Sequence, residues 1–216
     1  MTRESDIKKV LAPLARRRAD LFYKRRRFFL TPIRHVIRAV VIRPSYWGPG
    51  PFYVHWGVAL TFEPTAPLGW PLLPEVSRGA GWDVSAPGIA ERVWDLMEAE
   101  ALPPLDRIGS LDELDRFLEG RPQPTYGWQR YSGASFLLAV ARGNFGFCDE
   151  YLDGPFGYRT GYAAEKQRAE TLAPLISARD RAGIARLLHE WEAFRIKALK
   201  LEKYWEPTPF PVESEV

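Results

Sequence analysis

The stretch "FYVHWGVALTF", residues 52–62, decides the fold class. Its apolar residues occupy every second position, the spacing of a β-strand with one buried face. The preceding segment "IRHVIRAVVIR", residues 33–43, places Ile33, Ile37, Ala39 and Val41 on one face of a second strand. The turn-rich "PSYWGPG" of residues 44–50 joins the two, so the sequence predicts an antiparallel hairpin.

The apolar faces of this hairpin suggest a register. If paired residue numbers sum to about 95, Ile37 lies opposite Val58 and Val41 opposite Val54, which brings the apolar faces together. The other face then carries the polar side chains of both strands, namely Arg34, Arg38, Tyr53, His55 and Thr61. The sequence therefore predicts a basic, aromatic sheet face.

Elements on either side of the hairpin complete the predicted fold. Residues 4–18 have the apolar spacing of a short helix that Pro13 interrupts, and residues 20–30 predict two short strands around a tight turn near Lys24–Arg26. Helical spacing recurs at 88–102, 110–118, 132–142, 162–173 and 180–204, whereas 143–161 reads as a glycine-rich loop. Pro103 and Pro104 are expected to stop the first of these helices. Ser110, followed by Glu113, predicts a capping box at the start of the second.

Together these segments predict an α+β fold. We expect an antiparallel sheet of about four strands within residues 20–63, with an N-terminal helix and several C-terminal helices packed on it. Residues 1–207 would form a single domain, and residues 208–216 a loose C-terminal tail. In the last helix an apolar stripe is expected to face the core, made of Ile184, Leu187, Leu188, Trp191, Phe194, Ala198 and Leu199.

Charge is distributed unevenly along the chain. Residues 1–43 hold 13 Lys and Arg against 3 Asp and Glu, which leaves 17 against 24 for the remainder and a net charge of +3. Such an asymmetry indicates either a site for an anionic partner or the docking of one part of the fold on another. A single cysteine excludes an intrachain disulfide, and no apolar run approaches the length of a membrane-spanning helix. These features favour a soluble, cytoplasmic protein.

The sequence contains no catalytic or metal-binding motif that we can identify. His35, His55 and His189 do not share ligand spacing, and zinc needs about four converging ligands. Acidic neighbours of Cys148 oppose thiolate formation. Nucleophile elbows, phosphate loops and dinucleotide fingerprints are missing from the sequence as well. We therefore predict no catalytic residue, no metal and no cofactor.

Three functional hypotheses follow. The first is a noncatalytic interaction module that binds a protein partner through its basic face, formed by Arg25, Arg26, Arg34, Arg38, Tyr53 and His55. The second is a small-ligand binder or enzyme with a pocket around His55, Arg38 and Tyr53. The third is nucleic-acid binding through the basic and aromatic N-terminal hairpin, where cations could contact phosphates and rings could stack on bases.

Two segments resemble an uncharacterised bacterial family, the DUF4304 type. They are the basic, aromatic hairpin leading to "FYVHWGVAL" and the later "LMEAEALPPLDRIGSLDELDRFL", residues 96–118, so the resemblance covers mainly residues 1–120. It implies an antiparallel sheet flanked by helices, no established activity and no catalytic residue. It also implies a cytoplasmic bacterial protein that works by binding, since some members are similar to immunity proteins encoded beside toxins.

Overall fold

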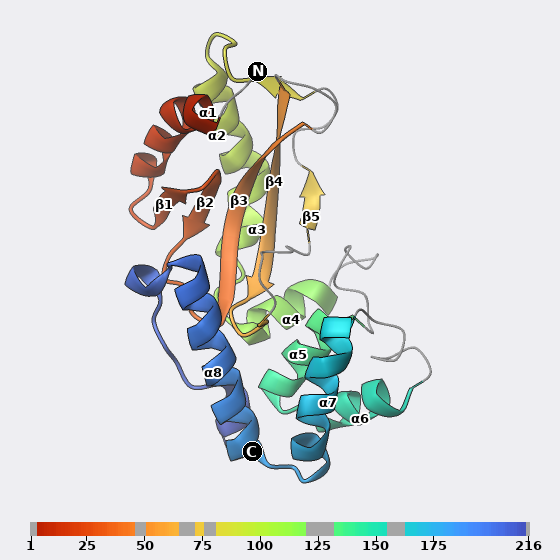
Figure 1. The fold of residues 1–216 in the computed structure, drawn as a ribbon. Helices are drawn as coiled ribbons and strands as arrows, with labels where there is room; N and C mark the ends of the chain where they lie inside the picture. The colour runs from red at the N-terminus through yellow and green to blue at the C-terminus, as the bar shows by residue number, and fades with distance from the viewer. Residues whose placement is uncertain are drawn as a thin grey trace.

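The computed structural model describes residues 4–45, 51–64, 72–75, 81–119, 132–154 and 163–214, with 72–75 described as backbone only. Its centre is an antiparallel sheet (Figure 1). The strands are β1 (Leu21–Lys24), β2 (Arg27–Leu30), β3 (Val36–Pro44), β4 (Pro51–Leu60) and β5 (Leu72–Glu75), in that order, with β6 (Trp82–Asp83) also paired to β4. The predicted α+β class with an antiparallel sheet is confirmed.

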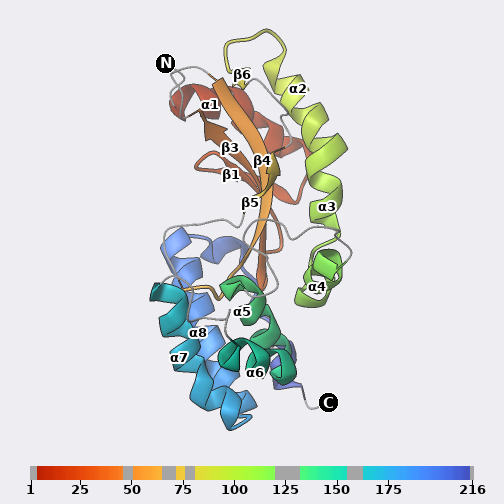
Figure 2. The same cartoon turned by 90° about the vertical axis from the view of Figure 1, so that its right-hand side faces the viewer.

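Helices precede and follow the sheet. The first are α1 (Glu4–Leu11) and the 3-10 helix η1 (Ala12–Arg17), followed after the sheet by α2 (Ile89–Leu96), the π-helical turn η2 (Met97–Ala101), α3 (Leu102–Asp106) and α4 (Leu111–Glu119). The last are α5 (Gly133–Arg142), α6 (Phe145–Asp153), α7 (Ala163–Ser177), α8 (Arg181–Leu199), η4 (Glu202–Tyr204) and η5 (Pro211–Glu213). Helices α2 and α3 lie on one side of the sheet and α8 on the other (Figure 2).

The register of the central hairpin differs from the predicted one by a single residue. Paired numbers sum to 96, so that Ile37 lies opposite Ala59 and Val41 opposite His55. The slip arose because β3 is apolar on both faces: every residue from Val36 to Ile42 is buried. Matching apolar faces therefore could not select the register. As a consequence Arg38 lies opposite Val58, on the other side of the sheet from His55 and Tyr53.

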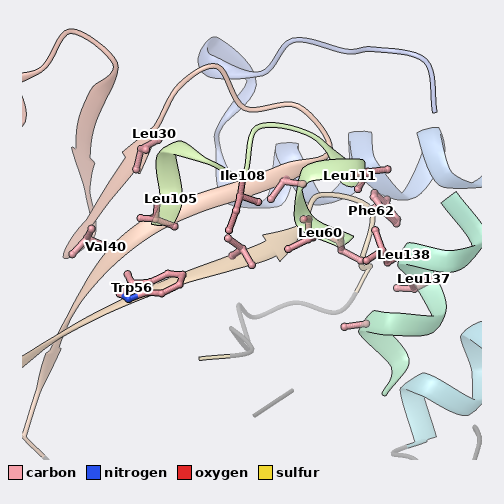
Figure 3. Packing of buried hydrophobic residues seen from close by; sticks show 14 of the residues in the cluster. Leu30, Val40, Trp56, Leu60, Phe62, Leu105, Ile108, Leu111, Leu137 and Leu138 are labelled. Atoms are coloured by element: carbon pink, nitrogen blue, oxygen red, sulfur yellow. The ribbon is translucent and has the colours of Figure 1, made fainter. Parts of the chain in front are cut away.

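Each face of the sheet has its own apolar core. The larger one joins alternate residues of β3 and β4, among them Val40, Trp56 and Leu60, to the segment from α3 to α4 and onward to α5 (Figure 3). The smaller one joins the other face to the end of α8; its buried members are Phe29, Ile33, Ile37, Ala39, Val41, Ala59, Ile196 and Leu201. Burial of both faces explains why β3 reads as an almost continuous apolar run.

Two expectations about the helices are wrong. Pro103 and Pro104 do not stop the helix, because the π-helical turn η2 precedes them and they fall in the first turn of α3, where a missing N–H costs no helical bond. Within the expected loop, Asn144 caps a helix instead: its side chain accepts from the Phe147 N–H at 3.2 Å and α6 begins. The capping box at Ser110 is confirmed in part, since Ser110 accepts from the Glu113 N–H at 3.2 Å while Glu113 accepts from Gly109.

The C-terminal tail is packed rather than loose. Phe210 and Val212 are fully buried in the larger core, and residues 211–213 form η5. The reverse error occurs in α8, where Phe194 is 59 % exposed although the predicted stripe points it inward. Among the described residues, no helix is long and apolar enough to cross a membrane.

Burial of Arg38 yields a test of the register. Its guanidinium donates to the Leu105 and Pro32 carbonyl oxygens at 3.4 and 3.3 Å, and burial lowers its pKa. We expect Arg38→Met to reduce the free energy of unfolding by about 1–2 kcal/mol, because the stem volume is kept and the hydrogen bonds are lost. Arg38→Glu should cost more than about 3 kcal/mol, since it buries an unpaired carboxylate beside carbonyl oxygens.

Urea unfolding monitored by fluorescence measures both changes. Arg34→Glu is the control, because Arg34 is exposed and its loss should change stability by no more than about 1 kcal/mol. If Arg38→Glu unfolded at the same urea concentration as Arg34→Glu, the buried placement of Arg38 would be wrong.

Candidate basic binding surface

Two arginines form the turn between β1 and β2. Lys24 and Arg27 are the last paired residues, so Arg25 and Arg26 alone connect the strands. Both have positive φ, 47° and 62°, which is the type I′ pattern of two-residue hairpins. The Ile42 N–H donates to the Arg26 carbonyl oxygen at 2.9 Å and attaches the turn to β3. The predicted tight turn is confirmed, and its two cations are held on a fixed backbone.

Further polar side chains lie on the sheet face that packs against α8, at the end of the sheet near this turn. Arg27 pairs with Val41, Val41 with His55, and Arg43 with Tyr53, so all of these residues share that face. The Tyr53 and His55 rings lie with their centroids 6.5 Å apart. Helix α8 ends beneath the hairpin (Figure 1), where Lys24 Nζ donates to the Lys200 carbonyl oxygen. We call the set Lys24, Arg25, Arg26, Arg27, Arg43, Tyr53 and His55 the basic sheet end.

Like charges crowd one another at the basic sheet end. Burial lowers the pKa of Lys24, and repulsion from Arg25 and Lys200 lowers it further, while Glu202 acts in the opposite direction. Arg25 is exposed and Arg26 half-buried, and neither forms an ion pair with any residue in the described ranges. The turn therefore presents two guanidinium groups that have no ion-pair partner in the part of the chain that the structure describes.

The six predicted site residues separate into three places. Arg25 and Arg26 form the turn, and Tyr53 and His55 lie on the adjoining sheet face. Arg34 stands outside the strands and pairs with Glu206 at 3.3 Å. Arg38 lies on the opposite face. A pocket built from His55, Arg38 and Tyr53 is thus ruled out by geometry, because the sheet separates Arg38 from the other two.

Sequence reasoning missed Lys24, Arg27 and Arg43 as members of the surface. The signal that could have found them is parity: once β3 and β4 pair with an even sum, odd-numbered residues of both strands share one face. Arg43 and His55 then fall together, and Arg27 follows from its pairing with Val41.

Two other N-terminal arginines are neutralised within the fold. Arg17 pairs with Glu91 of α2, and Arg18 pairs with Asp20 and, at 2.8 Å, with Asp106 of α3. The hydrogen bonds that Arg18 donates to Asp106 and Asp20 raise its pKa. Part of the positive charge near the N-terminus therefore serves the docking of this region on later helices. Arg25 and Arg26 take no part in such ion pairs within the described ranges.

A buried polar network anchors the C-terminal segment. His35 is 6 % exposed; its Nδ1 lies 3.1 Å from Oε1 of Glu192, which is fully buried on α8. The Thr61 hydroxyl donates to the same carboxylate oxygen. On the other side of the ring, His35 Nε2 lies 3.1 Å from the Pro209 carbonyl oxygen and 3.0 Å from the Thr208 hydroxyl. The ring also stacks on Phe210, with centroids 3.9 Å apart.

The Thr208–His35–Glu192 arrangement resembles a catalytic triad but has the wrong proton distribution. A carbonyl oxygen can only accept, so the contact with Pro209 requires Nε2 to carry a hydrogen. A donor nitrogen cannot remove the proton of Thr208, which a general base must do. The network therefore positions the chain, and His35 is a buried histidine with a hydrogen-bond contact at each ring nitrogen.

Metal and thiol chemistry find little support in the structure. Within the described ranges, no group of three or more His, Cys, Asp or Glu side chains could hold a metal ion. Cys148 is fully buried, and burial, followed by repulsion from Asp149, raises the pKa of its thiol to about 12. A thiol with this pKa carries almost no thiolate at neutral pH.

The role of Glu192 can be measured directly. Glu192→Ala leaves His35 Nδ1 and the Thr61 hydroxyl buried without an acceptor, so we expect a loss of about 3–5 kcal/mol in the free energy of unfolding. Amide hydrogen exchange at residues 206–213 should accelerate, because His35 anchors this segment. Phe194→Ser on the exposed side of α8 is the control and should change stability by about 0.5 kcal/mol or less. Equal effects of the two substitutions would contradict the anchoring role.

Comparisons with protein-family models, with curated proteins and with solved structures find no match for this chain. The similarity to the DUF4304 type consequently stays a hypothesis based on the two sequence segments. A functional proposal therefore has to be based on the geometry of the basic sheet end.

Proposed function

We propose that the protein is a noncatalytic binding module that captures an acidic partner protein at the basic sheet end. The Arg25–Arg26 turn would make the first contact. Tyr53 and His55 would supply a flat, partly apolar surface beside it, of the kind that is common at protein interfaces. An immunity-type role, in which the partner is a bacterial toxin, belongs to this proposal and is motivated by the family resemblance.

The backbone conformation of the turn supports this proposal most strongly. Both central residues have positive φ, where Asn and Gly are preferred and other L-residues lose about 1–2 kcal/mol. Arginine at both positions is therefore a poor choice for stability. Residues that break a local folding rule are expected at functional sites. Arg25 and Arg26 also form no ion pair with any described residue, which supports their availability to a partner.

The electrostatic setting favours an anionic partner. Burial, followed by repulsion from Arg25 and Lys200, lowers the pKa of Lys24. Carboxylates brought by a partner would relieve this repulsion and could form bidentate pairs with the arginines. Such contacts speed association and set specificity, and they weaken as salt is added.

The turn offers a substitution that separates binding from folding. Arg25→Asn combined with Arg26→Gly installs the preferred type I′ sequence, so we expect the free energy of unfolding to rise by about 1 kcal/mol. The same change removes both cations and should abolish partner binding. Thermal unfolding and binding assays on one preparation check both statements. A more stable variant that still binds would refute the role of the two arginines.

Site-specific crosslinking can identify the partner. A photoreactive amino acid at position 25 should capture it in the cells that produce the protein, whereas the same amino acid at exposed position 166 on α7 should not. Once the captured protein is purified, its Kd can be measured. Arg25→Glu plus Arg26→Glu should raise the Kd by about 100-fold or more, and the wild-type Kd should rise as salt is added.

The matched control is Lys166→Glu plus Arg186→Glu, which makes the same charge change at two exposed helical sites. It should leave the Kd within about threefold of wild type. If both double variants lost affinity equally, general charge rather than the basic sheet end would govern binding. If the species captured at position 25 were nucleic acid, the proposal of a protein partner would fail.

A further inference from the structure

A second group of charges is buried where the sheet meets the C-terminal helices. Glu63, just beyond β4, lies between Arg168 of α7 and Arg195 of α8. Arg195 Nη1 donates to the Glu63 carbonyl oxygen and lies 3.5 Å from Oε2, while Arg168 Nη1 lies 3.7 Å from Oε1. The side chains are 4 % exposed for Arg195, 7 % for Arg168 and 17 % for Glu63. One carboxylate is thus shared by two buried guanidinium groups.

One edge of Arg195 has no acceptor among the described residues. Its Nη1 donates to Glu63, whereas Nε and Nη2 are buried and have no hydrogen-bond partner within the described ranges. Unpaired buried N–H groups of a charged side chain are rare in folded proteins. Burial lowers the pKa of Arg195, and Arg168 lowers it further against the effect of Glu63. Segments 65–71 and 155–162, which adjoin Glu63 and α7 in the sequence and lie outside the described ranges, contain no Asp or Glu.

The free edge has the geometry of an oxyanion site. Nε–H and one Nη2–H of a guanidinium point in parallel and match two oxygens of a carboxylate or phosphate. We propose that Arg195 binds a small oxyanion, such as phosphate or a simple carboxylate, enclosed between β4, α7 and α8. The anion supplies Arg195 with a second negatively charged acceptor beside Glu63. This site is independent of the basic sheet end and of the partner proposed for it.

A buried water is the competing occupant. Oε2 of Glu192 also lacks a hydrogen-bond partner, and Glu192 lies one helical turn before Arg195 on α8. A water could accept from Arg195 and donate to Glu192. Such a water would make the stability of the protein insensitive to phosphate and acetate, which separates the two occupants by experiment.

The first measurement detects an enclosed anion. Protein purified in chloride and dialysed against phosphate is separated from free phosphate by gel filtration and then unfolded. Because Arg195 is almost inaccessible, we expect about one phosphate per chain to be released on unfolding. The same experiment with acetate distinguishes a phosphate site from a general oxyanion site. Release of neither anion would overturn the proposal and indicate water.

The second measurement uses variants. The Tm of wild-type protein should rise steadily as phosphate or acetate is added. Arg195→Lys keeps the positive charge but loses the two parallel N–H groups, so it should raise the apparent Kd for the anion about tenfold or more. Arg179→Met is the control, because Arg179 is exposed and pairs with Asp149 at 2.5 Å; its anion response should equal that of wild type.

Substitution of Glu63 separates an anion-binding role of Arg195 from a purely structural role. Glu63→Gln removes the negative charge that competes with the anion for Arg195. It should lower the Tm measured in the absence of phosphate, and it should lower the apparent Kd for phosphate about tenfold or more. If Arg195→Lys failed to fold, Glu63→Gln would still decide the matter. An identical anion response in wild type, Arg195→Lys and Glu63→Gln would contradict the proposed site.

Discussion

The pairing of β3 with β4 in a register that sums to 96 is the constraint on which the rest of the structure depends. It places Arg38 in the larger core, beneath α3, and places Tyr53 and His55 on the face that α8 partly covers. Because side chains alternate along a strand, no later packing can exchange these two sets without breaking the whole ladder. Both the helices that cover each face and the composition of the basic sheet end follow from this single register.

The paired and unpaired cations of the N-terminal region show what its charge is for. Arg17 and Arg18 hold α1 and η1 to α2 and α3 through Glu91 and Asp106. Arg34 performs a similar task toward Glu206. Arg25 and Arg26 differ from these arginines, because they occupy unfavourable backbone angles and form no ion pair with the part of the chain that the structure describes. Net charge alone could not have shown this difference, which depends on backbone conformation and pairing together.

Sequence reasoning recovered the parts of the fold that local rules determine. The β3–β4 hairpin, the β1–β2 turn, the Ser110 cap and the helix that Ser132 begins all follow from alternation, length and capping. It failed where tertiary context decides. The register was undetermined because β3 is buried on both faces, and the helix at 145–153 was hidden by glycines that a single Asn144 cap overrides. For the candidate site, the expected grouping of Tyr53 with His55 on one sheet face agrees with the structure, whereas Arg38 was misplaced by one step of register.

Helix α8 shows why its orientation could not be predicted from apolar spacing. Its expected stripe includes Phe194, which is exposed, while the buried side includes Glu192 and Arg195. These two polar residues contact Thr61 and Glu63 at the end of β4, so they fix which side of the helix meets the sheet. Apolar contacts tolerate small rotations, whereas a buried carboxylate and a buried guanidinium each require specific partners. The polar side of α8 therefore sets how the C-terminal helices sit on the sheet, and it leaves Arg195 with a free edge as a consequence of that fit.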